Sequence, residues 1–123
     1  MREDNLRLIL ETFINNNKEY GIGEICVSTN DGLPITDVEV KENLYNVQEI
    51  AASSALISNT IKHISSVLSI KDAYMVLILN NSIQICVITR QLISIFILSQ
   101  KNVIDISDNL ISLCDSILKE LLG

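Results

Sequence analysis

Cysteine and histidine are scarce in this 123-residue chain, and their spacing argues against catalysis. Cys26, Cys86 and Cys114 show no CxxC spacing, and His63 is the only imidazole. A reactive thiol needs a nearby base or positive charge, and nothing local places His63 beside a cysteine. We therefore interpret the three cysteines as buried, reduced thiols. His63 is expected on a helix surface or at a helix interface, and no metal ligand is assigned.

The carboxylates around one predicted hairpin are the next candidates. Asp31 could pair with Asp37 or Glu39 for acid–base catalysis. Because they flank a turn, solvation is the simpler interpretation. Gly21-Ile22-Gly23 is a GxG alone, and the chain contains no GxxxxGK(S/T) phosphate loop, so turn glycines are the simpler interpretation there. No catalytic residue, cofactor-binding residue or metal site is predicted, and the chain is expected not to be an enzyme.

The amino-acid composition limits the kinds of partner that the chain is expected to bind. Hydrophobic residues make up 48% of the chain, aromatics only 4%, and the formal net charge is −6. An acidic chain lacks the electrostatic attraction that drives binding to nucleic acid or to an anionic membrane. No apolar run approaches the ~18 residues of a membrane span, and the first residues show no secretory signal. We expect one cytoplasmic domain over residues 1–123, with neither nucleic-acid binding nor membrane insertion.

Hydrophobic spacing predicts three helices and five strands in the order α-β-β-α-β-β-β-α. Asp4 or Asn5 can cap a first helix, and Asn46 with Glu49 resembles a capping box for the second. Asn30-Asp31-Gly32 is typical of a hairpin turn, and Pro34 places its strand at a sheet edge. The first helix is predicted to begin at about residue 4 or 5, to be weakened at residues 15–17 and to end at Gly21 or Gly23, and the other two helices are predicted at about residues 44–68 and 107–122. The strands are predicted at residues 25–27, 33–35, 73–79, 83–88 and 93–98, with residues 89–91 joining the last two.

The last three strands are apolar at both odd and even positions, which indicates a sheet covered on both faces. One long helix on one face is narrow cover for five strands, with two helices on the other. The strand at residues 73–79 carries no charge or proline, so as an edge strand it invites pairing. A two-fold copy supplies both a second long helix and a pairing strand. These residues therefore predict a dimer.

Three blocks carry a resemblance to a known family. Residues 21–35, which end in Asp-Gly-Leu-Pro-Ile, look like a first hairpin; residues 49–56 are similar to an alanine-rich helix start; residues 118–122 fit a final helix. Together with the element order they resemble the roadblock family, which includes the dynein light-chain roadblock and MglB-like domains, over nearly the whole chain. The sequence departs from the family pattern at Ile104-Asp105 and Asn80-Asn81, where glycine is frequent.

The resemblance implies an α+β sandwich with a five-stranded antiparallel sheet between one long helix and two terminal helices. It implies pairing with a second copy or a roadblock paralogue through the third strands and the central helices, without a cofactor. The expected interface residues are Tyr74, Val76, Ile78, Ile57, Ile61 and Ile64. Family members are scaffolds or regulators, often of small Ras-like GTPases, and the expected docking residues on the central helix are Gln48, Ala52, Ala55, Asn59 and Lys62.

Alternatives stay open at this point. The resemblance fits a nucleotide-independent, light-chain-like structural adaptor as well as a GTPase regulator. A third hypothesis is a small-molecule-binding or enzymatic domain that uses Cys26 or Cys86. Arg90, expected in a loop, is the best-placed arginine to act in trans on a GTPase, although an ion pair or a solvated loop position is the simpler interpretation. MglB-like regulators are understood to activate by repositioning the GTPase, so this role needs no arginine.

Overall fold

The computed structural model describes residues 2–40, 46–69, 74–80 and 83–123. Its elements follow the predicted order and give the predicted α+β class. The helices and strands are α1 (Arg2–Asn16), β1 (Glu24–Thr29), β2 (Pro34–Glu39), α2 (Val47–Leu68), β3 (Tyr74–Asn80), β4 (Ile83–Arg90), β5 (Ile93–Ser99) and α3 (Ser107–Leu122), with 3-10 turns at Lys18–Tyr20 and Val103–Ile106.

The strands form one sheet in the order β2-β1-β5-β4-β3, and every neighbouring pair is antiparallel. The edges are therefore β2 and β3. Pro34 begins the edge strand β2 as predicted, since proline has no N–H to donate to a second neighbour. Gly32, in the turn between β1 and β2, has a φ of +94°, which glycine adopts without strain.

The helix ends follow from local chemistry. The side-chain oxygen of Asn46 accepts hydrogen bonds from the backbone N–H groups of Gln48 and Glu49, at 2.9 and 3.2 Å, so its predicted capping role is confirmed. The predicted helix start at residue 44 and the predicted strand start at residue 73 lie outside the described residues. The first helix begins at Arg2, before its predicted caps.

The connection predicted at residues 89–91 is wrong. Thr89 and Arg90 continue β4, where they pair with Ser94 and Ile93 of β5. The turn itself is shorter and contains Gln91, which has a φ of +54°. Extending β4 to Arg90 pairs backbone groups that a three-residue loop would leave without strand partners.

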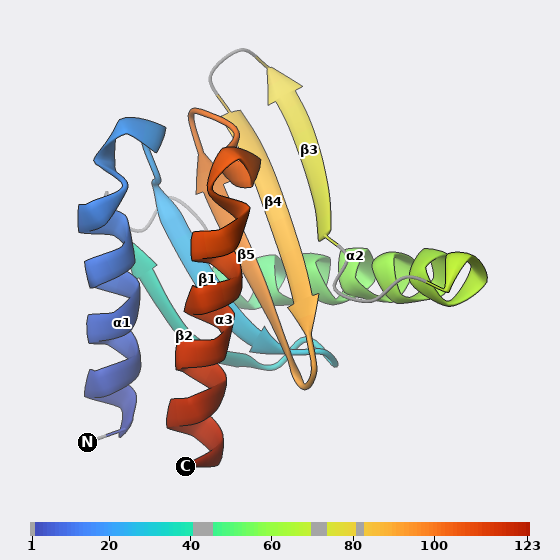
Figure 1. The fold of residues 1–123 in the computed structure, drawn as a ribbon, viewed down its shortest axis with the longest axis horizontal. Coiled ribbons are helices and arrows are strands. Elements are labelled where there is room, and N and C mark those ends of the chain that lie inside the picture. Colours follow the sequence, from blue (N-terminus) through green and yellow to red (C-terminus); the bar gives the residue numbers. More distant parts are fainter. Residues whose placement is uncertain (1, 41–45, 70–73, 81–82) are drawn as a thin grey trace.

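Helices α1 and α3 lie side by side over one face of the sheet, and α2 lies on the other (Figure 1). The core below α1 and α3 is the larger one and is built from aliphatic side chains, including Leu10, Ile25, Ile95, Ile97, Leu110 and Ile117, each no more than 1% exposed. A smaller core on the α2 side contains Cys26, Ala51, Ile61, Val87 and Phe96. The prediction of a sheet covered on both faces is confirmed.

Small side chains bring α2 close to the sheet. Ala51, Ser54 and Ser58 are fully buried at helical spacing on its inner face. The Ser58 hydroxyl is hydrogen-bonded to Thr89 and to Ser94, at 2.5 and 2.9 Å. These hydrogen bonds satisfy hydroxyl groups that are shielded from water, and they help to hold α2 in place over β4 and β5.

The central strand β5 offers a direct test of this packing. Ile97→Ala removes a fully buried side chain and should lower the free energy of unfolding by about 3 kcal/mol, because a cavity remains in the aliphatic core. Urea unfolding followed by circular dichroism measures the change. The matched control is Leu92→Ala at a side chain 63% exposed, for which we expect a change below about 0.5 kcal/mol. Equal losses in the two variants would contradict the assigned core.

Candidate functional site

The five expected docking residues gather along one flank of α2. Gln48, Ala52, Asn59 and Lys62 are exposed and Ala55 is half-buried. Successive helix residues are about 100° apart, so these spacings of three and four keep all five on one side. We call this strip the docking flank. Ala55 lies close to the β1–β2 turn: a Cβ atom added to Gly32 would stand 3.2 Å from the Cβ atom of Ala55.

A second strip on α2 is apolar and exposed. Leu56 is 72% exposed, Val67 70%, Leu68 59% and Ile64 46%. By the same 100° rotation, Ile64 and Leu68 lie on the side of the helix opposite the docking flank, whereas Leu56 and Val67 lie between the two and face away from the buried side of α2. Figure 1 shows the C-terminal half of α2 extending past β3, beyond the sheet it covers. We call these four residues the apolar flank; apolar side chains gathered at one exposed place are typical of an interaction site.

The structure divides the expected dimer residues on α2. Ile64 is exposed on the apolar flank, Ile57 is half-buried beside it, and Ile61 is only 5% exposed because it packs on the chain's own sheet. Ile61 therefore contributes to the core, and the exposed area comes from Leu56, Val67 and Leu68 instead. Amphipathic spacing alone did not separate them, because the helix extends beyond the sheet that would have covered it.

The other three expected dimer residues lie on β3. Tyr74 and Ile78 pair with Ile88 and Gln84 of β4, and the opposite side of β3 is an edge of the described sheet. Val76 is half-buried and packs against the core below α1 and α3. The edge strand β3 and the C-terminal half of α2 thus lie on the same side of the molecule (Figure 1).

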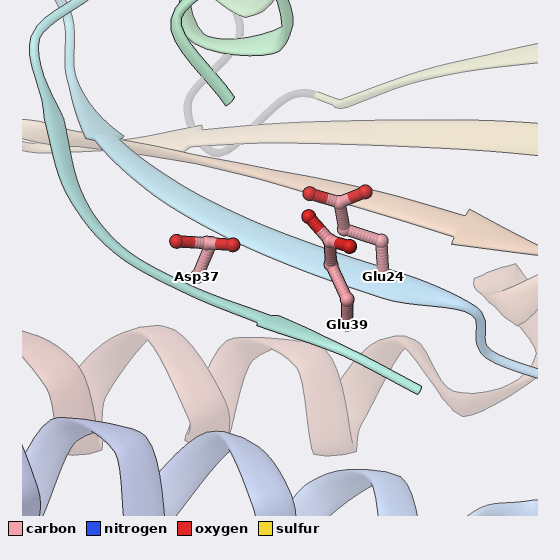
Figure 2. Close-up of side chains that lie close together, drawn as sticks. All are labelled: Glu24, Asp37 and Glu39. Atoms are coloured by element: carbon pink, nitrogen blue, oxygen red, sulfur yellow. The ribbon is translucent and has the colours of Figure 1, made fainter. Parts of the chain in front are cut away.

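A second feature is a group of three carboxylates on β1 and β2 (Figure 2). Glu24 and Glu39 are directly opposite in the β1–β2 ladder, and Asp37 is paired with Cys26 two positions along. One carboxylate oxygen from each of the three lies within 4.8 Å of the others. Asp31, proposed from sequence as their partner, is exposed in the turn and is not in this group.

Glu24 was not predicted as a member of this group, because the residues that lie next to it depend on how β1 pairs with β2. Counting outward from a two-residue Asp31-Gly32 turn places Glu24 opposite Glu39, which is the observed pairing from Val27 outward, so the turn motif was the signal that could have found it. Glu24 is 1% exposed, and neither of its carboxylate oxygens has a hydrogen-bond partner among the described residues. Burial, and then the charges of Glu39 and Asp37, raise the pKa of Glu24 from 4.5 to about 7.

The thiols are buried as predicted. Cys26, Cys86 and Cys114 are free cysteines, and burial raises the pKa of each thiol to about 12. Near Cys26, the charges of Asp37 and Glu24 add to the effect. Because the thiolate is the reactive form, these environments do not support the hypothesis of a nucleophile at Cys26 or Cys86.

The remaining candidates lie on the surface. His63 is exposed on α2. Arg90 ends β4, and its Nε lies 2.9 Å from Oδ1 of Asp115 on α3, so the ion-pair interpretation is confirmed. An arginine tied to its own third helix is poorly placed to enter a partner's active site. Among the described helices, none has the length and apolar character that crossing a bilayer requires.

Comparison with known proteins gives the fold. No family model matches the sequence, and no curated protein matches it. Among solved structures, the gliding protein MglB of Thermus thermophilus superposes with a TM-score of 0.76 at 8% identity, covering 97% of this chain and 90% of the other. A Roadblock/LC7 domain from Streptomyces avermitilis has a TM-score of 0.71 at 10% identity, with coverages of 94% and 97%.

A further structure, described as MglB with a tetrameric arrangement, has a TM-score of 0.77 at 8% identity and covers 97% of this chain and 89% of its own. At such low identities the likeness concerns the fold. The chain has the roadblock fold, as the sequence blocks predicted.

The buried Glu24 predicts an unusual pH dependence. Because its pKa is raised on folding, the native chain binds the proton more tightly than the unfolded chain. The stability contribution is complete below pH 4.5 and is lost as pH rises through about 7. In metal-free buffer, Glu24→Gln should remove this loss and raise the free energy of unfolding at pH 8 by about 1–3 kcal/mol.

Urea unfolding of both proteins between pH 5 and pH 8 measures the effect. Asp31→Asn, which removes an exposed carboxylate of the same hairpin, should keep the wild-type pH dependence. A Glu24→Gln variant whose stability falls with pH as steeply as the wild type's would contradict the assignment.

Proposed function

We propose that this chain is a non-enzymatic, dimeric scaffold or regulator that binds a small Ras-like GTPase. The observation that carries the proposal is that α2 presents both exposed apolar residues and the docking flank, within a roadblock fold whose edge strand β3 contacts this helix. The fold suggests the class of protein. The two flanks suggest how one helix serves two partners.

The apolar flank and the β3 edge favour a second copy as the first partner. A two-fold axis beside β3 would pair β3 with its own copy and place two α2 helices side by side. Leu56, Ile64, Val67 and Leu68 would then be covered by the same residues of the partner. This arrangement removes the open edge and the exposed apolar surface together. A roadblock paralogue with a similar α2 would fit the same surfaces.

The docking flank would face outward in a dimer whose α2 helices meet through Ile64 and Leu68, because it lies on the opposite side of α2 from these two residues. Ala52 and Ala55 have small side chains that let a partner's backbone approach closely, and Gln48, Asn59 and Lys62 supply hydrogen-bond donors around them. The pairing of Arg90 with Asp115 supports activation by repositioning the GTPase rather than by an arginine. A switch segment of a GTPase is an adaptable loop, which could dock on the rigid helix surface that the docking flank provides.

The dimer predicts a specific sensitivity. Val67→Glu places a charge on the apolar flank and should weaken self-association by at least about tenfold, since a buried unpaired charge costs more than 1.4 kcal/mol. Size-exclusion chromatography with light scattering at micromolar concentration measures the mass. Leu33→Glu, at an equally exposed leucine in the β1–β2 turn, is the matched control and should leave the dimer intact. A wild-type monomer under these conditions would refute the dimer.

The docking flank predicts a separate sensitivity. In a pull-down from source lysate with GDP or a non-hydrolysable GTP analogue, the tagged dimer should enrich a Ras-like GTPase in one nucleotide state. Ala52→Arg should reduce the captured GTPase at least about tenfold, because the long charged side chain blocks close approach, while the dimer stays intact. Ala52 suits this test better than Ala55, which is half-buried near Gly32.

Ser116→Arg on the exposed side of α3 is the matched control and should bind normally. Unchanged binding by Ala52→Arg would refute the docking flank. A captured partner indifferent to nucleotide would instead support the structural-adaptor alternative.

A further inference from the structure

The backbone fixes the three carboxylates of Glu24, Asp37 and Glu39 on one face of the sheet. Side chains alternate along a strand, so Asp37 and Glu39 project to the same side, and Glu24 joins them because it is paired with Glu39. Cys26, next along β1 on that face, belongs to the core beneath α2. Figure 2 shows the three side chains on the side of the sheet away from α1 and α3.

The group carries negative charge that the described chain does not compensate. Glu24 is 1% exposed, and both of its carboxylate oxygens lack a hydrogen-bond partner among the described residues. Among the described residues, no lysine or arginine forms an ion pair with Glu24, Asp37 or Glu39. The ion pair between Arg90 and Asp115 lies elsewhere, between β4 and α3. Like charges directly opposite in a ladder, such as Glu24 and Glu39, repel each other.

A buried carboxylate without a partner is costly, so the folded chain must hold either a proton or a cation at this place. Two observations are independent here: the register gathers three acids, and one of them is buried, unpartnered and directed at the other two. A buried carboxylate without a hydrogen-bond partner is typical of a metal ligand rather than of a solvated acidic surface. Asp37 and Glu39 are half-buried, which leaves a route for an ion from solvent.

The donor atoms indicate the kind of cation. All are carboxylate oxygens, which hard divalent ions prefer. Ca²⁺ binds oxygen at about 2.3–2.6 Å, so ligands on opposite sides of it stand about 5 Å apart; for Mg²⁺ the corresponding separation is about 4 Å. The three oxygens, within 4.8 Å of one another, fit inside a calcium coordination shell. Three carboxylates in one site also favour Ca²⁺, since Mg²⁺ is usually held by one or two carboxylates and keeps several of its waters.

We propose that Glu24, Asp37 and Glu39 form a divalent-cation site with a preference for Ca²⁺ over Mg²⁺. The ion would join β1 to the edge strand β2 and compensate the charge of Glu24. This site is separate from both flanks of α2, and its existence does not depend on the proposed function.

Calorimetric titration of the full chain with CaCl₂, MgCl₂ and MnCl₂, after removal of metals, tests the proposal. We expect one Ca²⁺ per chain, a rise in the thermal midpoint with Ca²⁺, and weaker binding of Mg²⁺. Glu39→Gln and Asp37→Asn, at half-buried positions that should tolerate the change, should each weaken Ca²⁺ binding at least about tenfold.

Asp31→Asn is the matched control because it removes the same charge from an exposed turn of the same hairpin. It separates a built site from the general attraction of cations to an acidic chain. Equal weakening in Asp31→Asn and Glu39→Gln would overturn the site, as would the absence of any Ca²⁺-dependent heat and midpoint shift in the wild type. Binding of Mg²⁺ or Mn²⁺ without Ca²⁺ would overturn the calcium assignment.

Discussion

The sheet is apolar on both faces, and the arrangement of the molecule follows from the need to cover them. Along β5, Ile95 and Ile97 face the larger core while Phe96 belongs to the core beneath α2. Helices α1 and α3 together cover one face, whereas α2 covers the other alone. Burial of aliphatic surface is the main favourable contribution to folding, so the face with a single helix remains the less complete of the two.

That imbalance gives α2 its several roles. Its inner face is made of small residues that allow close approach and place Ser58 against Thr89 and Ser94. Its C-terminal half continues past β3 and presents leucine, isoleucine and valine to solvent. The flank on the other side keeps small and polar residues. One helix can therefore fix the fold, associate with a second α2 and still present a surface to a further partner.

The carboxylate group is the place where the chain departs from the pattern of its own sheet. Most buried side chains of the described strands are apolar or carry a hydroxyl group, but Glu24 puts an acid in a buried position with two more acids beside it. Natural sequences depart from local consistency mainly at sites of function or strain. The cost of this position, and the compensation that a proton or a cation would bring, distinguish it from the ordinary solvated acids of an acidic protein.

Much of the fold could be predicted from the sequence because the relevant interactions are local. Helical spacing gave α3 its bounds of Ser107–Leu122, Asn46 capped α2 as its side chain predicts, and Pro34 required an edge strand. The burial of the three cysteines was predicted from their lack of CxxC spacing and of a nearby base. In each case the determining contacts are made within a few residues along the chain.

Tertiary structure decided what depends on residues far apart in sequence. The length of β4 through Arg90 was set by pairing with β5, and the fate of Ile61 and Ile64 was set by where the sheet ends beneath α2. The sequence by itself determined the order of the elements, their inward faces and the roadblock resemblance, since periodicity and turn chemistry are local. Only the folded sheet buried Glu24 beside Asp37 and Glu39, because burial depends on the helix and strands that pack around a position and not on the hairpin alone.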